Sequence, residues 1–169
     1  MQGVIDYLSK NETRFVSELC DYVRFPSVSA QPQHRSDVQA CAKWVVKQSQ
    51  QIGLEARLCS TPGHPIVIAR TPRAKTKGRR RPHFVVYGHY DVQPAEPLDL
   101  WKSPPFEPQT RNGALYGRGA SDNKGQNLAH LKAVEAYLKT GTELPCDLTF
   151  VIEGEEEVGS TSLTSLRSP

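Results

Sequence analysis

Two short apolar runs, residues 84–87 and 147–152, lie on either side of a segment with helical periodicity at residues 123–139. A short apolar run is typical of a buried strand, and apolar residues spaced three and four apart are typical of a helix. The order strand, helix, strand predicts a β-α-β unit, in which the two strands run parallel. This pattern predicts an α/β fold.

The rest of the chain adds further helices and strands to this unit. Helical periodicity covers residues 4–24, ending before Pro26, and residues 37–52, ending before Gly53. Proline cannot continue a helix, and glycine is favoured just after one. The remaining predictions are strands at 54–58 and 66–69 with a turn at 61–65, a basic loop at 71–82 and an irregular loop at 91–112.

Length and composition indicate one domain and argue against two classes of partner. The chain has 169 residues and a formal charge of only +3, so local charge clusters carry more information than the total. The basic residues at 73–81 have no interleaved aromatics, which argues against nucleic-acid binding. No run approaches the roughly 18 apolar residues of a membrane span.

The four cysteines are widely spaced and form no Cys-x-x-Cys pair. They are Cys20, Cys41, Cys59 and Cys146. This spacing predicts free thiols in a reducing compartment, and hence a cytoplasmic protein.

Metal-ligating side chains follow the predicted strands. His89 and Asp91 come directly after the first apolar run, Asp122 stands at the start of the helix, and residues 155–157 are three glutamates after the second run. Because parallel strands end at the same edge of a sheet, these side chains are expected to converge there. Imidazole and carboxylates together are the ligands of a hydrolytic metal site, holding zinc or a harder divalent ion.

The chemistry of each side chain suggests a role. A carboxylate such as Asp122 can bridge two ions, and His89 can supply a nitrogen ligand. Asp91 is placed to orient the imidazole. Of Glu156 and Glu157, one can bind metal while the other takes a proton from the attacking water.

Each feature also has a purely structural interpretation. Asp122 alone could cap a helix, and the glutamates could form a solvated loop. Other kinds of site fit poorly. The segment from Gly117 has Asp122 where a dinucleotide fingerprint needs its third glycine, and Ser121 lacks the second glycine of a nucleophile elbow.

Four segments in order carry a family resemblance: residues 24–29, 87–94, 115–125 and 153–160. With them the chain resembles the zinc metallopeptidase family of carnosinase-like dipeptidases, acetylornithine deacetylases, succinyl-diaminopimelate desuccinylases, aminoacylases and glutamate carboxypeptidases. The resemblance implies that His89 and Glu157 are terminal metal ligands and that Asp122 bridges the ions. It also implies that Asp91 orients His89 and that Glu156 is the general base.

The same resemblance implies a three-layer α-β-α fold with a mostly parallel mixed sheet and a cis peptide bond at Asp122–Asn123. It implies two Zn²⁺ ions per full-length subunit, with Mn²⁺ or Co²⁺ as alternatives, and a homodimer. The segments at 91–94 and 101–106 are more similar to the dipeptidase branch, which acts on small peptides, than to the deacylases of N-acyl amino acids.

Family members are longer, and they draw a further acidic ligand and a last histidine from later sequence. Residues 1–169 are therefore expected to be the N-terminal part of a catalytic domain, without the dimerisation and lid domain or the C-terminal catalytic segment. Two alternatives remain open: an N-acyl amino acid deacylase, and an inactive fragment that binds metal weakly or acts through interactions.

Overall fold

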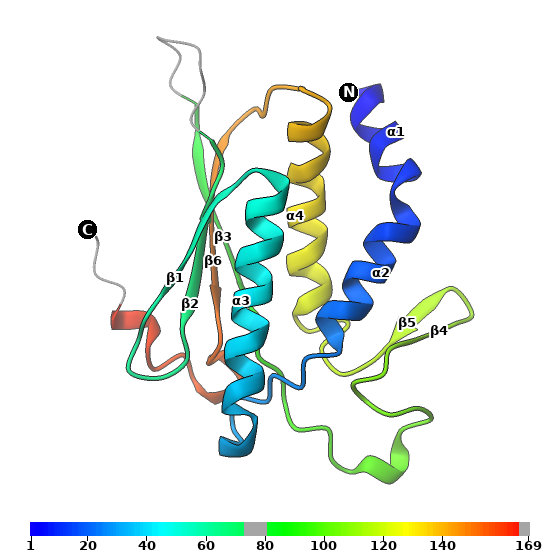
Figure 1. The fold of residues 1–169 in the computed structure, drawn as a ribbon, viewed down its shortest axis with the longest axis vertical. Helices are drawn as coiled ribbons and strands as arrows, with labels where there is room; N and C mark the ends of the chain where they lie inside the picture. Colours follow the sequence, from blue (N-terminus) through cyan, green and yellow to red (C-terminus); the bar gives the residue numbers. More distant parts are fainter. Residues whose placement is uncertain (73–80, 166–169) are drawn as a thin grey trace.

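The computed structural model describes residues 1–72 and 81–165 (Figure 1). The α-helices of this part are α1 (Gln2–Lys10), α2 (Glu12–Val23), α3 (Arg35–Ile52) and α4 (Lys124–Lys139). The strands are β1 (Glu55–Cys59), β2 (Ile66–Arg70), β3 (His83–His89), β4 (Gln109–Arg111), β5 (Ala114–Tyr116) and β6 (Asp147–Glu153). The predicted α/β class is confirmed.

Four of the strands form a mixed sheet in the order β1-β2-β6-β3. Strands β3 and β6 are parallel and are joined through α4, which confirms the predicted β-α-β unit. β1 and β2 pair antiparallel, as does β2 with β6, so one of the three pairings within this four-stranded sheet is parallel. The turn at 61–65 is too short for a parallel crossover, so β1 and β2 form a hairpin.

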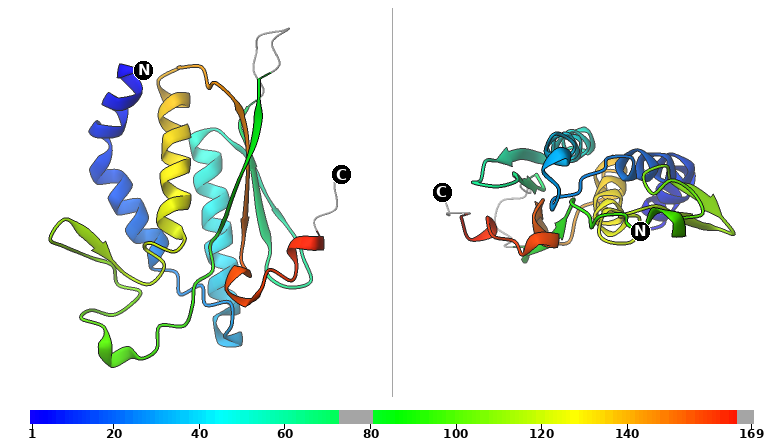
Figure 2. Two further views of the ribbon diagram at one scale, coloured as in Figure 1. Left: turned by 180° about the vertical axis from the view of Figure 1, so that it is seen from behind. Right: turned by 90° about the horizontal axis from the view of Figure 1, so that it is seen from below.

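Helices α3 and α4 cover one face of this sheet, and α1 and α2 pack against α4 (Figures 1 and 2). Phe150 and Ile152 of β6 point into the resulting core and are almost fully buried. Val85 and Tyr87 of β3 are 65% and 50% exposed. Among the described residues, helices therefore cover only one face, where a three-layer fold has helices on both.

The N-terminal helical segment is divided at Asn11. The sequence predicts one helix over residues 4–24, whereas α1 ends at Lys10 and α2 begins at Glu12. The Asn11 side chain donates to the carbonyl of Tyr7 at 2.8 Å. Asparagine side chains compete in this way for the backbone groups of a helix, which accounts for the break.

The other predicted segments agree closely with the structure, apart from two loops. The irregular loop at 91–112 includes a short 3₁₀ turn at Leu98–Leu100, and its end forms the β4–β5 hairpin. Residues 73–80 of the basic loop lie outside the described part. Arg81 contacts the Leu144 carbonyl and the Asp147 carboxylate. No helix in the described ranges is long and apolar enough to cross a membrane.

Candidate metal centre

The parallel pair β3–β6 brings the predicted site residues to one edge of the sheet. His89, the last residue of β3, is in register with Glu153, the last residue of β6. Residues 156–158 form a 3₁₀ turn just beyond β6, and α4 begins two residues after Asp122. The convergence expected from the β-α-β topology is confirmed.

Three of the predicted residues form a group that could hold a metal ion. Ligand atoms of His89, Glu156 and Glu157 all lie within 4.8 Å of one another. Asp122 contacts the same imidazole, with its Oδ1 3.0 Å from Nε2 of His89. The side chain of Asp122 is 74% exposed and that of Glu156 is 42% exposed, so both carboxylates can reach an incoming ion or substrate.

Asp91 lies beneath this group and is completely buried. Its carboxylate accepts hydrogen bonds from the Ser29 hydroxyl at 2.6 Å and from the backbone N–H groups of Glu156 and Glu157 at 3.3 and 3.1 Å. One carboxylate thus fixes the turn that carries both glutamates. This contact was not foreseen from the sequence, which predicts only that Asp91 orients His89.

The imidazole of His89 is held by the same residue in two ways. Its Nδ1 lies 3.1 Å from the backbone carbonyl of Asp91 and 3.4 Å from the carboxylate. A carbonyl can only accept a hydrogen bond, so Nδ1 carries the proton, and Nε2 is left toward Asp122 and Glu156 as the ligand atom. The second histidine nitrogen of a metal site is commonly held by such an acceptor.

The electrostatics of the group favour a cation. Burial lowers the pKa of His89, but the hydrogen bond and charge of Asp91, together with the charge of Glu156, outweigh burial and raise that pKa to about 9. A proton is the smallest cation that the site can hold, and a divalent ion would replace it. One imidazole nitrogen with several carboxylate oxygens fits zinc, manganese or cobalt.

Comparison with known proteins assigns the family. The model of peptidase family M20/M25/M40 matches residues 85–167. The Beta-Ala-His dipeptidase of Homo sapiens is 34% identical over 98% of this chain and 34% of its own length. The Cys-Gly metallodipeptidase DUG1 of Candida albicans is also 34% identical, over 98% of this chain and 36% of its own length. The chain carries a domain of this peptidase family over residues 85–167.

Solved structures of M20 dipeptidases superpose on the whole described fold. The di-peptidase Dug1p of Saccharomyces cerevisiae has a TM-score of 0.88 at 31% identity, covering 98% of this chain and 36% of that structure. Human carnosine dipeptidase 1 has a TM-score of 0.87 at 33% identity, with the same coverage. The chain thus spans about a third of the length of these relatives.

The start of α4 differs from the expectation that Asp122 caps the helix, and it agrees with the expected cis peptide bond. Asp122 does not cap the helix: the N-cap is Asn123, and it makes no side-chain capping bond. Instead, the Asn123 side chain accepts from the backbone N–H of His89 at 3.2 Å. The Asp122–Asn123 peptide bond is cis, as the resemblance to the M20 family implies.

Close backbone packing behind His89 depends on Gly88. A Cβ atom at that position would lie 2.0 Å from Oδ1 of Asn127, whose Nδ2 donates to the His89 carbonyl at 2.6 Å. Asn127 is buried within α4. The missing side chain at Gly88 therefore allows Asn127 of α4 to pack against the end of β3 and to donate directly to the His89 carbonyl.

Glu155 is directed away from the candidate metal centre, toward Ser162 and Gly63. It is 7% exposed and accepts from the backbone N–H of Ser162 at 3.1 Å. A Cβ atom on Gly63 would lie 1.8 Å from its Oε1. Glu155 thus packs the β1–β2 turn against the segment that follows the glutamates.

Sequence reasoning missed two supporting residues, Ser29 and Lys124. Both lie within segments that carry the family resemblance, but neither has a metal-ligand side chain. Lys124 is completely buried, and its Nζ donates to the carbonyls of Tyr22 and Phe25 at 3.1 and 2.7 Å. These hydrogen bonds connect the C-terminal end of α2 to the N-terminal end of α4. A lysine two residues after Asp122 was the available signal.

Proposed function

We propose that this chain provides part of the active site of a metal-dependent dipeptidase, which hydrolyses the amide bond of a dipeptide. The observation that carries the proposal is the grouping of His89, Glu156 and Glu157 within 4.8 Å at the carboxyl ends of the parallel strands. The names of the relatives support this substrate class, since those proteins are dipeptidases for Beta-Ala-His and Cys-Gly.

In this proposal His89, Asp122 and Glu157 would hold two divalent ions, and the Asp122 carboxylate would serve as a ligand to both. Zinc is the first choice and manganese or cobalt the alternatives, because nitrogen and carboxylate ligands accept all three. Bound metal would supply Lewis acidity, which makes water more acidic and polarises a carbonyl. The donor set of the described residues gives three ligands for two ions once Glu156 is reserved as a base.

Glu156 is the proposed general base. Its carboxylate is 42% exposed, and its Oε2 lies 3.9 Å from Nε2 of His89. It is therefore next to the proposed ligand His89 and still accessible to solvent. It can accept a proton from the attacking water and return it to the leaving amine. Asp91 acts through the other residues, by orienting His89 and fixing the backbone of Glu156 and Glu157.

A glutamine in place of Glu156 tests this assignment. In the active enzyme, Glu156→Gln is expected to abolish dipeptide turnover and to leave the metal content unchanged, because glutamine keeps the shape but cannot accept the proton. Turnover and metal content are measured on the same preparation, the latter by elemental analysis. Loss of metal would instead assign Glu156 as a ligand.

Two other functions are alternatives. A succinyl-diaminopimelate desuccinylase of Dechloromonas aromatica is 36% identical over 69% of this chain, which favours N-acyl amino acid deacylation as the nearest alternative. The alternative of another class is that residues 1–169 are inactive by themselves and bind metal weakly or act through interactions. Assays of the purified chain with dipeptides and N-acyl amino acids, with zinc or manganese added, separate the three.

Location and assembly also belong to the proposal. The four cysteines are free in the structure, which supports a reducing compartment and hence a cytoplasmic protein. A full-length form is proposed to be a homodimer, with no nucleic-acid or membrane partner. Light scattering of the purified protein measures its oligomeric state directly.

A further inference from the structure

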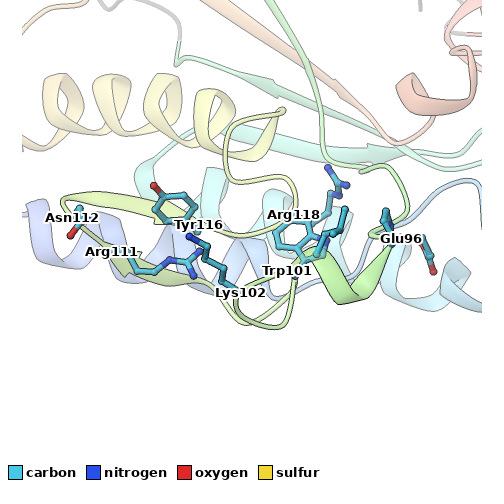
Figure 3. Close-up of a pocket in the computed structure, with 9 residues that line it drawn as sticks. Glu96, Trp101, Lys102, Arg111, Asn112, Tyr116 and Arg118 are labelled. Atoms are coloured by element: carbon cyan, nitrogen blue, oxygen red, sulfur yellow. The ribbon is translucent and has the colours of Figure 1, made fainter.

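A pocket separate from the candidate metal centre lies between the loop after β3 and the β4–β5 hairpin (Figure 3). Its volume is about 490 Å³, which is within the range of small-molecule sites. None of the proposed metal ligands lines it. The side chains that define it are Glu96, Trp101, Lys102, Arg111, Tyr116 and Arg118.

The charge of the pocket is positive. Lys102, Arg111 and Arg118 contribute three positive charges and Glu96 one negative charge, which leaves a net charge of +2. Throughout residues 1–72 and 81–165, no carboxylate forms a salt bridge with any of these three cations. Three unneutralised cations around one cavity favour an anionic ligand.

Two of the cations are held against aromatic rings. The Arg111 guanidinium lies 4.2 Å from the centre of the Tyr116 ring, and that of Arg118 lies 5.4 Å from the centre of the Trp101 ring. Arg118 also donates to the carbonyl of Pro94 at 3.0 Å. A guanidinium already held against a ring loses little side-chain freedom when it binds a ligand.

One donor in the wall of the pocket has no partner. The Nε of Arg118 is buried and makes no hydrogen bond in the described structure. Trp101 on the same wall is fully used, since its indole N–H donates to the Ala95 carbonyl at 2.8 Å. Buried donors are normally paired, so an unpaired one beside a cavity indicates space for an acceptor.

The cavity is too large for an inorganic ion alone, and part of its wall is apolar. Pro97, Leu100 and Trp101 line it beside the charged groups. In Figure 3, Arg111, Lys102 and Tyr116 lie together toward one end, and Trp101 and Arg118 lie toward the other. A ligand that fills this space needs an acidic group for the first set, and an apolar body beside Trp101 that leaves room for an acceptor at the Nε of Arg118.

We propose that this pocket binds a small organic acid whose carboxylate or phosphate contacts Arg111 and Lys102 and whose apolar or aromatic body packs beside Trp101. Arg111 can form two parallel hydrogen bonds to such a group, and Lys102 adds a point charge. This site is independent of the proposed metal centre, so its test does not depend on peptidase activity.

The two tryptophans of the chain provide a test with an internal control. Trp101 lines the pocket, whereas Trp44 stacks on Tyr22 in the core at 4.7 Å between ring centres. In ¹⁵N-labelled protein, phenylacetate and phenyl phosphate are each expected to shift the indole resonance of Trp101 in a saturable way and to leave that of Trp44 unchanged. The acid that saturates at the lower concentration identifies the preferred acidic group.

Two probes divide the ligand into its parts. Phenylacetamide keeps the ring and lacks the charge, and inorganic phosphate keeps the charge and lacks the ring. Both are expected to bind at least tenfold more weakly than the matching organic acid. Equal binding of phenylacetamide would overturn the role of the cations, and equal binding of inorganic phosphate would overturn the role of the apolar wall.

Charge-removing variants complete the test. Arg111→Gln and Lys102→Gln are each expected to weaken phenylacetate binding at least fivefold. Lys43→Gln, at an exposed position on α3, removes the same charge away from the pocket and is expected to change nothing. An unshifted Trp101 resonance at saturating millimolar phenylacetate, or equal effects of the three variants, would refute the proposal.

Discussion

The two sides of the His89 imidazole differ sharply. Below the ring, Asp91 is completely buried and accepts hydrogen bonds from Ser29, Glu156 and Glu157. Above it, Asp122 is 74% exposed and Glu156 is 42% exposed. The buried side is fixed by the fold, whereas the exposed side presents carboxylates that repel one another until a cation arrives. The residue that supports the imidazole is therefore distinct from the exposed carboxylates around it, and each can be mutated separately.

The largest effect is expected from removing the buried carboxylate. Asp91→Ala leaves the Ser29 hydroxyl and two backbone N–H groups without their acceptor. We expect it to lower the free energy of unfolding by about 3 kcal/mol or more, because each unpaired buried group costs about 1–3 kcal/mol. Urea denaturation without metal measures this loss. A change below about 1 kcal/mol would contradict the supporting role of Asp91, since an ordinary surface substitution does no more.

The next largest effect is on metal affinity as a function of pH. The pKa of His89 is raised from 6.5 to about 9 in the fold, so the imidazole carries a proton that a metal must displace. That proton stabilises the metal-free fold fully below pH 6.5, and this contribution is lost as the pH rises through 9.

Zinc affinity therefore rises with pH, by about tenfold per pH unit between roughly pH 6 and 8. Isothermal titration in two buffers with different ionisation enthalpies measures the affinity and the protons released. A pH-independent affinity with no proton release would show that His89 is already neutral in this range.

A smaller effect is expected from removing the side chain that donates a hydrogen bond to Asp91. Ser29→Ala removes the 2.6 Å hydrogen bond to the Asp91 carboxylate. We expect the free energy of unfolding to fall by about 1–2 kcal/mol, with a several-fold loss in zinc affinity as the turn of Glu156 and Glu157 loosens. Ser29→Thr, which keeps the hydroxyl, is expected to restore both quantities.

Ser49→Ala is the matched control for that variant. Ser49 is buried in α3 and donates to the Val45 carbonyl at 2.8 Å, away from the metal centre. Its loss is expected to leave zinc affinity unchanged. Equal effects of the two alanine variants on zinc affinity would mean that Ser29 has no specific role in positioning Asp91.

The smallest effect on stability is expected on the exposed side. Asp122→Asn changes a 74% exposed side chain, so the metal-free protein is expected to keep its free energy of unfolding within about 0.5 kcal/mol. Metal binding is expected to weaken strongly, because an amide offers one neutral oxygen in place of a charged bridging group. Thermal unfolding with and without zinc measures both quantities. A loss of stability in the metal-free protein, with no change in the stabilisation by zinc, would show that Asp122 supports the fold and does not bind metal.

Sequence patterns located the site because the β-α-β topology leaves few choices. Apolar runs of strand length, separated by a helix, place His89 and the glutamates at the same sheet edge whatever the details of packing. The same patterns could not show that Asn11 divides the first helix or that Asn123 replaces Asp122 as the N-cap. Those outcomes depend on competing hydrogen bonds of similar strength, which periodicity does not measure.

The sequence by itself determined the order of strands and helices, the candidate ligand residues and the family resemblance, because these depend on residue type and spacing. Only the tertiary structure decided that Ser29 and the backbone of Glu156 and Glu157 meet on Asp91, and that Arg111 and Arg118 border one pocket. Such contacts join residues distant in the chain. They are set by how the layers pack, a property that local spacing does not contain.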